Sequence, residues 1–254
     1  MYIACFKEAN FDTERIFHMK PKTFFAVFGI IMLLATNCAS FYFSEAIVNH
    51  KKYDVLGVDV SSYQGDINWH MLQQQGVKFA FIKATEGSSF KDSFIASNLK
   101  NAADTNIYFS AYHFFSFDSS GKTQAQNFIN TVGKNQISLP PVVDVEFYGG
   151  KSKNPPNVSE TTEILSQLLN GLENYYGKKP IIYTTLPVYL MYIKNSFSDY
   201  PLWIRNVRCE PFMLNWSFWQ YSGKGLLSGY NGNEKYIDLN VYNGTINEFK
   251  SQFL

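Results

Sequence analysis

Short β-rich runs alternate with helix-like stretches from residue 55 onward, and this alternation restricts the fold more than any other feature of the sequence. Strands separated by helices predict βα units that build a parallel sheet. Eight such strands in about 200 residues predict an α/β protein, a distorted (β/α)8 barrel of the TIM type in which some helices are short or missing. The predicted strands are 55–60, 79–85, 107–115, 141–147, 180–184, 202–206, 218–221 and 237–241, and the predicted helices are 69–75, 90–103, 123–132, 160–176 and 187–195.

An apolar run at residues 24–44 precedes the barrel region and contains no charged residue. Its 21 residues are enough for an apolar helix that spans a bilayer. Arg15, Lys20 and Lys22 lie before the run, which predicts that the amino terminus stays in the cytoplasm and that the rest is exported. We therefore assign residues 1–52 to a cytoplasmic leader with a signal peptide or transmembrane anchor, and residues 53–254 to the barrel.

Retention and cleavage of the apolar run both stay open. A cleaved signal peptide is the main alternative to an anchor, and Met19 could then be the true start, because a short basic stretch and the apolar run follow it. The stretch that ends at Cys38 also faintly resembles a lipoprotein cleavage site, although Asn37 is atypical there. A buried helix of the barrel is disfavoured, since the run is long and uniformly apolar.

Charge and cysteine content exclude several classes of function. The chain has 22 Lys and Arg residues against 21 Asp and Glu residues, so it lacks the basic surface that a nucleic-acid partner requires. Of three cysteines only Cys209 lies in the barrel region, which excludes an internal disulfide framework there. The four histidines are not paired at ligand spacing, so we predict neither a metal nor another cofactor. We expect a monomer whose only membrane contact is through residues 24–44.

Carboxylates interrupt two of the apolar strands, near the ends where the βα loops of a parallel barrel form one rim. Asp59 lies near the end of the first strand, and a buried carboxylate is costly unless it is paired or hydrogen-bonded. Asp144 and Glu146 alternate with Val143 and Val145, so both acids project from the same face. Two carboxylates about 7 Å apart repel each other, which raises one pKa and keeps a proton available. Glycoside hydrolysis requires such an acid beside a second carboxylate.

The last predicted strand carries a further acid, Asp238, among apolar residues. Asp238 is expected to approach Asp59, because the first and last strands of a closed barrel are neighbours. Aromatic and amide side chains near other strand ends would complete a sugar-binding cleft, since rings stack on sugar faces while hydroxyl and amide groups fix orientation. The residues predicted to bind substrate are Tyr112, Tyr183, Trp203 and Gln220.

Seven short motifs together resemble those of the glycoside hydrolase family 25 lysozymes, the Chalaropsis-type muramidases. They are Gly57-Val58-Asp59-Val60-Ser61, Ile67-Asn68-Trp69, Lys83-Ala84-Thr85-Glu86-Gly87, Ala111-Tyr112-His113-Phe114, Asp144-Val145-Glu146, Trp219-Gln220-Tyr221 and Ile237-Asp238-Leu239-Asn240. The resemblance runs from about residue 55 to residue 249 and follows the order of the family's motifs. The apolar run at 24–44 is not part of the family pattern.

The resemblance implies a distorted β/α barrel that cleaves the β-1,4 bond between N-acetylmuramic acid and N-acetylglucosamine in peptidoglycan. It implies that Glu146 is the proton donor and that Asp59, Asp144 and Asp238 are the other active-site acids. Peptidoglycan strands are then the partner of an exported enzyme that faces the cell wall or periplasm from the membrane, or is secreted. The biological role, whether wall remodelling, antagonism or phage lysis, stays open.

Several alternatives remain at this stage. Asp144, two residues before Glu146, suits a mechanism in which the 2-acetamido group of the sugar attacks its own anomeric carbon. A covalent glycosyl-enzyme and an inverting mechanism with a base-activated water are the rivals. The alternative functions are a chitinase-like hydrolase, a glycan-binding barrel without activity, and a structural or adhesion protein displayed from a membrane.

Overall fold

The structure is a computed structural model that describes residues 45, 46 and 48–254. Eight strands form a closed barrel, in which β1 pairs with β2 on one side and with β9 on the other. A ninth strand, β3, forms a short antiparallel extension of β2. The strands are β1 (Leu56–Val60), β2 (Val77–Glu86), β3 (Phe90–Lys91), β4 (Tyr108–Phe114), β5 (Val142–Val145), β6 (Ile181–Thr185), β7 (Leu202–Arg205), β8 (Phe218–Gly225) and β9 (Ile237–Tyr242).

The direction of β9 differs from the prediction. Neighbouring barrel strands from β1 to β8 are parallel, as predicted, but β9 is antiparallel to both β8 and β1. The reason is the connection, because no helix lies between β8 and β9, and a parallel return requires a long crossover. The expectation of a wholly parallel sheet was therefore wrong for the last strand. The closed α/β barrel itself is confirmed.

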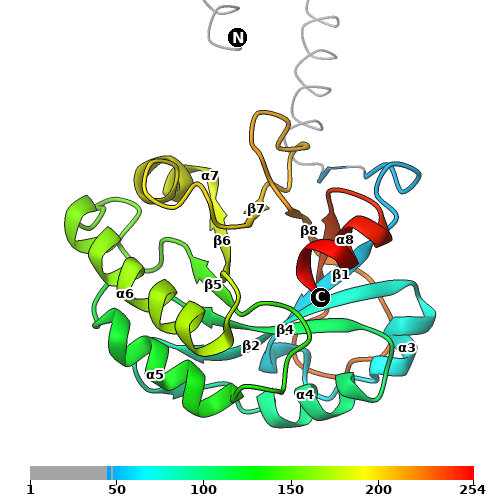
Figure 1. The fold of residues 1–254 in the computed structure, drawn as a ribbon. Coiled ribbons are helices and arrows are strands. Elements are labelled where there is room, and N and C mark those ends of the chain that lie inside the picture. The colour runs from blue at the N-terminus through cyan, green and yellow to red at the C-terminus, as the bar shows by residue number, and fades with distance from the viewer. Residues whose placement is uncertain (1–44, 47) are drawn as a thin grey trace, which may run out of the picture. The chain divides into compact units, whose positions relative to one another are not determined.

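Helices cover the outside of the barrel, and the connections between the later strands carry fewer of them (Figure 1). The predicted helix at 90–103 is shorter than expected, because Phe90 and Lys91 pair with β2. The helices are α3 (Trp69–Gln74), α4 (Ile95–Ala103), α5 (Gly121–Val132), α6 (Val158–Tyr176), α7 (Leu186–Val188) and α8 (Ile246–Phe253), with a 3-10 turn η1 (Ser62–Gln64) and a π-helical turn η2 (Tyr189–Ile193).

Close packing between α5 and α6 requires glycine. The two helices lie side by side on the outside of the strands (Figure 1). A Cβ atom on Gly121 would lie 2.0 Å from the carbonyl oxygen of Ile164 in α6, and one on Gly171 would lie 2.9 Å from the Cβ of Ala125. Asn157 caps the start of α6 by accepting a hydrogen bond from the backbone N–H of Glu160.

Aromatic side chains fill the barrel interior beneath the rim. Alternation along β2 places Phe79 and Phe81 inside and Ala80 and Ile82 against the helices. Inside, the ring centroids of Phe81 and Trp203 are 4.4 Å apart. Phe249 and Phe253 of α8 pack on the same interior cluster. The interior is therefore a packed core, which supports the side chains at the rim above it.

The segment before β1 contacts the barrel through Glu45, Ala46, Val48 and Tyr53. The compact unit begins at Glu45, whose carboxylate accepts hydrogen bonds from the hydroxyl of Ser222 and, at 3.3 Å, from the backbone N–H of Gly223. Val48 and Tyr53 are buried in a cluster that includes Trp216. Glu45, Ala46 and Val48, which belong to the predicted leader, therefore contact the barrel. No helix within residues 45, 46 and 48–254 is long and apolar enough to cross a membrane, and the predicted apolar helix at 24–44 lies outside the described residues.

Removal of residues 45–54 should destabilise the barrel. We compare a chain that starts at residue 45 with one that starts at residue 55. Loss of the buried Tyr53 and Val48 should lower the melting temperature by roughly 6–20 °C, because deletion of a large core side chain costs about 3–5 kcal/mol. Differential scanning calorimetry measures the shift, with Lys51→Ala in the longer chain as the exposed control. Equal melting temperatures for the two chains would show that the segment adds no stability.

Candidate active site

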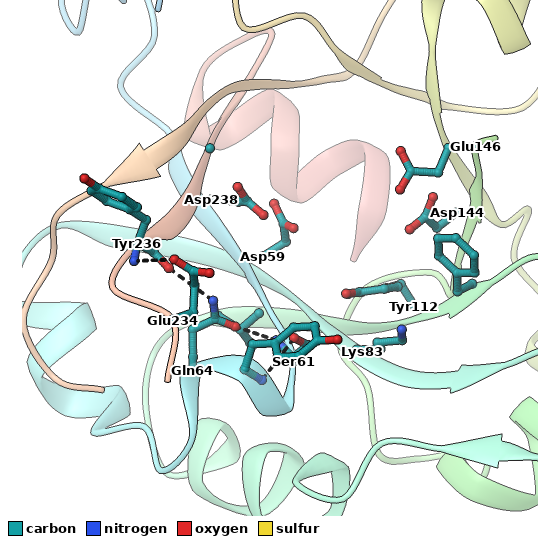
Figure 2. Close-up of a pocket in the computed structure, with 14 residues that line it drawn as sticks. Asp59, Ser61, Gln64, Lys83, Tyr112, Asp144, Glu146, Glu234, Tyr236 and Asp238 are labelled. Carbon is teal, nitrogen blue, oxygen red and sulfur yellow. Dashed lines mark hydrogen bonds between the residues drawn. The ribbon is translucent and has the colours of Figure 1, made fainter. Parts of the chain in front are cut away.

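The four carboxyl groups predicted for the active site line one cleft at the rim of the barrel, together with that of Glu234 (Figure 2). Asp59 near the end of β1 and Asp238 in β9 are directly opposite each other across the two strands. Asp144 lies in β5, and Glu146 follows the last residue of that strand. In Figure 2 the carboxyl groups of Asp59 and Asp238 lie beside each other, and those of Asp144 and Glu146 form a second pair. The cleft has a volume of about 340 Å³.

The reversed direction of β9 explains how Asp238 reaches this rim. Asp238 is the second residue of β9, so in a parallel strand it would lie at the opposite end of the barrel from Asp59. Because β9 is antiparallel to β1, its amino-terminal end lies beside the carboxyl end of β1. The predicted approach of Asp238 to Asp59 is found, through a strand direction that the sequence pattern did not indicate.

Asp59 is held by two amide side chains. Its Oδ2 atom accepts hydrogen bonds from Gln220 Nε2 at 2.9 Å and from Asn240 Nδ2 at 2.8 Å. The hydroxyl of Tyr183 donates to Gln220 Oε1 at 3.0 Å, and the indole N–H of Trp203 donates to Asn240 Oδ1 at 2.8 Å. These outer contacts fix which amide atom faces Asp59. The aspartate is therefore oriented by a buried network, while its pKa is raised by burial in spite of the two donors.

Asp144 is buried, with one oxygen that has no partner. It is 7% exposed and lines the cleft, and its Oδ1 atom has no hydrogen-bond partner among the described residues. Burial and the negative charge of Glu146 raise its pKa well above the usual range. A buried polar atom without a partner is costly in a folded protein. Asp144 is thus a carboxyl group that lines the cleft and has an unused hydrogen-bond acceptor.

Glu146 and Asp238 also hold their protons more tightly than free carboxylic acids. Burial raises the pKa of Glu146, and the positive charge of Arg205 opposes this effect. Burial and the negative charge of Asp59 raise the pKa of Asp238 to about 8. A carboxylic acid that stays protonated near neutral pH can donate a proton to a leaving group. The cleft therefore combines available protons with carboxylates that can stabilise positive charge.

The raised pKa of Asp238 predicts a pH-dependent gain in stability for Asp238→Asn. Between the unfolded pKa near 3.8 and the folded value of about 8, the native state binds more protons than the unfolded state. The free energy of unfolding of the wild type should therefore fall as pH rises through this range. Asparagine cannot ionise, so the variant should gain about 1–2 kcal/mol, or roughly 3–6 °C, over the wild type by pH 8. Thermal melts from pH 4 to pH 9 measure the difference, and a gap that stays constant with pH would contradict the assignment.

The four residues predicted to bind sugar differ in exposure. Tyr112 is half-buried and lines the cleft. Tyr183, Trp203 and Gln220 are 5%, 2% and 3% exposed, and together with Tyr112 they line an inner cavity of about 290 Å³ next to the acids. The polar atoms of Tyr183, Trp203 and Gln220 already form hydrogen bonds in the network around Asp59. Contact of these four residues with substrate stays a prediction.

Other residues of the cleft were not predicted as site residues. Lys83 in β2 donates to Glu86 at 3.0 Å, and Arg205 ends β7 beside the acids. Lys83 and Arg205 could have been found by the pattern that identified the acids, a polar residue near the end of an apolar strand. Asn240 lies two residues after Asp238 and therefore projects from the same face of the strand. Glu234 and Tyr236 reach the cleft from the loop before β9, where no periodic pattern indicated them.

Among the residues that the structure describes, no group of three or more His, Cys, Asp or Glu side chains is arranged to hold a metal ion. Carboxyl groups can transfer protons and stabilise positive charge without a metal. We therefore expect EDTA to leave hydrolysis by the full chain unchanged. The assay follows reducing-end release with EDTA, with EDTA plus excess Mg²⁺, and without additions. Activity that is lost in EDTA and restored by the cation would contradict this expectation.

A closed α/β barrel with paired carboxyl groups at one rim is typical of glycoside hydrolases. Comparison with known proteins specifies the family. The sequence model described as Glycosyl hydrolases family 25 matches residues 58–230. A solved family 25 glycosyl hydrolase from Bacillus anthracis is 49% identical, with a TM-score of 0.77 over 83% of this chain and 98% of that one. The chain belongs to glycoside hydrolase family 25 and is an enzyme of that class.

Two curated relatives agree with this family. The uncharacterized protein YegX of Escherichia coli (strain K12) is 35% identical over 82% of this chain and 76% of its own length. Lysozyme M1 of Streptomyces globisporus is 31% identical over 75% of this chain and 68% of its own length. The predicted resemblance to family 25 is confirmed.

Proposed function

We propose that this protein is a lysozyme, a muramidase that hydrolyses the β-1,4 bond between N-acetylmuramic acid and N-acetylglucosamine in peptidoglycan. Relatives named lysozyme and N,O-diacetylmuramidase support this substrate. The observation that carries the mechanism is the buried Oδ1 atom of Asp144, which lacks a partner in a cleft that Glu146 shares. We also propose that the active form is a monomer, because one chain supplies every side chain used below.

In the first step Glu146 transfers its proton to the glycosidic oxygen as the bond from that oxygen to the anomeric carbon breaks. The carbonyl oxygen of the sugar's own 2-acetamido group attacks the anomeric carbon and forms a cyclic oxazolinium ion. Asp144 accepts a hydrogen bond from the acetamido N–H through its free Oδ1 atom and stabilises the positive charge that develops. The leaving sugar departs with the proton from Glu146, so charge and atoms balance.

In the second step water opens the oxazolinium ring. Glu146, now a carboxylate, removes a proton from that water as its oxygen bonds to the anomeric carbon. The acetamido group is regenerated and Glu146 is again an acid. Asp59 and Asp238 lie on the other side of the cleft in Figure 2. Because Asp238 holds the proton of this pair, the negative charge that favours the cationic transition state is that of Asp59.

The supporting residues divide by exposure. We propose that Tyr112, which is half-buried in the cleft, contacts the sugar directly. Tyr183, Trp203 and Gln220 contact it only at the floor of the inner cavity, and their larger effect is to orient Asp59 through hydrogen bonds. Tyr112→Phe should therefore affect KM, whereas Gln220→Ala should affect kcat.

A substrate without the 2-acetamido group separates the proposed mechanism from its rivals. If the acetamido oxygen is the nucleophile, replacing it by a hydroxyl should abolish turnover although the strand still binds. A covalent intermediate on Asp59 or Asp238, or inversion by an activated water, would retain measurable turnover on that substrate.

The function itself is tested by comparing peptidoglycan with chitin. We expect the full chain to release reducing ends from purified peptidoglycan much faster than from chitin, which shares the acetamido groups but lacks muramic acid. Faster hydrolysis of chitin would favour a chitinase-like enzyme. Binding to either polymer without release would favour a glycan-binding barrel.

We propose that the enzyme is exported, because peptidoglycan lies outside the cytoplasmic membrane and the run at 24–44, with its basic flank, has the form of an export signal. Retention as an anchor and cleavage are both compatible with this proposal. Fractionation of cells that express the full chain, followed by amino-terminal sequencing, separates them. A full-length cytoplasmic product would refute export.

A further inference from the structure

We infer that Arg205 binds a carboxylate of the substrate and so makes the site selective for acidic glycan strands over neutral ones. The inference rests on the proposed function. It starts from the position of Arg205 as the last residue of β7, opposite Thr185 of β6 and Gln220 of β8. Arg205 lines the inner cavity together with Glu146 and Asp238.

The guanidinium group of Arg205 has no carboxylate partner. Ion pairs within the described residues join Lys52 to Glu210, Lys83 to Glu86, Lys151 to Asp118 and Lys179 to Asp199. No carboxylate oxygen of these residues lies within 4.0 Å of the Arg205 nitrogens, and no hydrogen bond from its side chain is found among them. Lys83, the other cation of the site, is paired with Glu86. Arg205 is therefore the cation of the site whose donors are available.

The space in front of Arg205 is open because residue 223 is glycine. A Cβ atom on Gly223 would lie 3.3 Å from Asp238 Oδ1 and 4.0 Å from a guanidinium nitrogen of Arg205. Any side chain at this position would fill the gap between the arginine and the aspartate. Gly223 also lines the larger cleft, so a group on a bound strand can approach Arg205 from that side.

The charges around Arg205 explain why its partner is expected on the substrate. Glu146 and Asp238 both experience its positive charge, which opposes the rise of their pKa values, but neither is close enough for an ion pair. Without Arg205 the cleft would keep one cation, Lys83, which is paired with Glu86, and its acids would repel an acidic substituent. A planar guanidinium with five donors binds a carboxylate through two parallel hydrogen bonds, which a neutral hydroxyl cannot match.

Two carboxylates on peptidoglycan have this chemistry. Muramic acid carries a lactyl group, whose carboxylate is free when the stem peptide is absent, and the stem peptide carries carboxylates of its own. Chitin has neither. Binding through Arg205 would therefore discriminate between two polymers that share the same acetamido sugars.

Equilibrium binding to matched strands tests the inference. The full chain carries Glu146→Gln to prevent turnover, and its Kd is measured by calorimetry with stem-free glycan strands and with intact strands. Each is compared with the same preparation after its carboxylates have been converted to methylamides. The Kd for the charged strands should be at least about tenfold lower than for their amides, as expected for a charged hydrogen-bonded pair. Arg205→Ala should bring this ratio close to one.

Two further variants serve as controls. Arg205→Lys keeps the charge without the planar fork and should retain part of the ratio. Arg208→Ala removes an exposed arginine that lines neither cavity and should leave the ratio unchanged. The Kd of Arg205→Ala for the amidated strands should stay within about twofold of the Kd of the Glu146→Gln parent. This result would show that the barrel and cleft are intact in the variant.

The source of the carboxylate follows from the preparation in which the ratio of Kd values depends on Arg205. A dependence with stem-free strands identifies the lactyl carboxylate, and a dependence with intact strands identifies a carboxylate of the stem peptide. A ratio that survives Arg205→Ala, or no ratio with either preparation, overturns the inference. These outcomes are distinct from a failure of the proposed function. If the protein cleaves peptidoglycan but its ratio of Kd values does not depend on Arg205, only the inference is wrong. If the ratio depends on Arg205 but the protein releases no reducing ends, only the proposed function is wrong.

Discussion

Glu146→Gln should fold normally and lower the turnover of peptidoglycan at least about a hundredfold, since general-acid catalysis contributes that much. Glutamine preserves the shape of the side chain but has no carboxylic proton for the glycosidic oxygen. Glu146 lines the cleft directly after the last residue of β5, and burial raises its pKa. The loss should fall on kcat, because binding of the strand does not need this proton.

Reducing-end release under saturating substrate measures the effect of Glu146→Gln, and circular dichroism and thermal melts verify its fold. Glu163→Gln is the matched control, because Glu163 is exposed on α6 and lines neither cavity of the site. Near-wild-type lysis by a folded Glu146→Gln protein would remove Glu146 from the acid role.

Asp144→Asn should cost a comparable factor, about a hundredfold or more in kcat, since the free Oδ1 atom is proposed to act on the same transition state. Asparagine can present its amide nitrogen or a neutral oxygen but cannot supply negative charge. The double variant should lose little more than either single variant, because the pair acts as a unit.

The same substitution should stabilise the protein at neutral pH. Burial and the neighbouring Glu146 raise the pKa of Asp144, so ionisation of this carboxyl group costs free energy of folding. Asp144→Asn should therefore melt at a higher temperature than the wild type, whereas Asp104→Asn at an exposed position should not. A mild loss of activity combined with lower stability would show that Asp144 has a structural role instead.

The strands were predictable because each is a short apolar run bounded by polar or turn residues, and all eight barrel strands lie where the sequence indicated. Direction was not predictable, since periodicity along β9 is the same for a parallel and an antiparallel strand. Helix α8 was missed although Thr245 and Glu248 form a capping box at its start. This capping box is visible in the sequence, but it lies after the last predicted strand, beyond the alternation of strands and helices from which the barrel was predicted.

The acids of the site were predictable for a different reason. A carboxylate inside an apolar strand is expensive to bury, so Asp59, Asp144 and Asp238 stand out from their neighbours. Their supporting partners do not. Asn240 resembles any polar residue of a half-exposed strand, and only the three-dimensional structure shows that its amide binds Asp59 while Trp203 holds its other end. Arg205 was the second-last residue of a predicted strand, but its lack of an acidic partner depends on side-chain positions that sequence periodicity does not encode.

The identity of the sugar at the newly formed reducing end tests the central claim most directly. Purified peptidoglycan is digested with the full chain, reduced with borohydride and hydrolysed, and the reduced sugars are identified by mass spectrometry. Cleavage after N-acetylmuramic acid predicts that reduced muramic acid appears with the wild type and is at least about a hundredfold lower with Glu146→Gln. Reduced glucosamine without reduced muramic acid, or equal amounts of reduced muramic acid from the two proteins, would contradict the account.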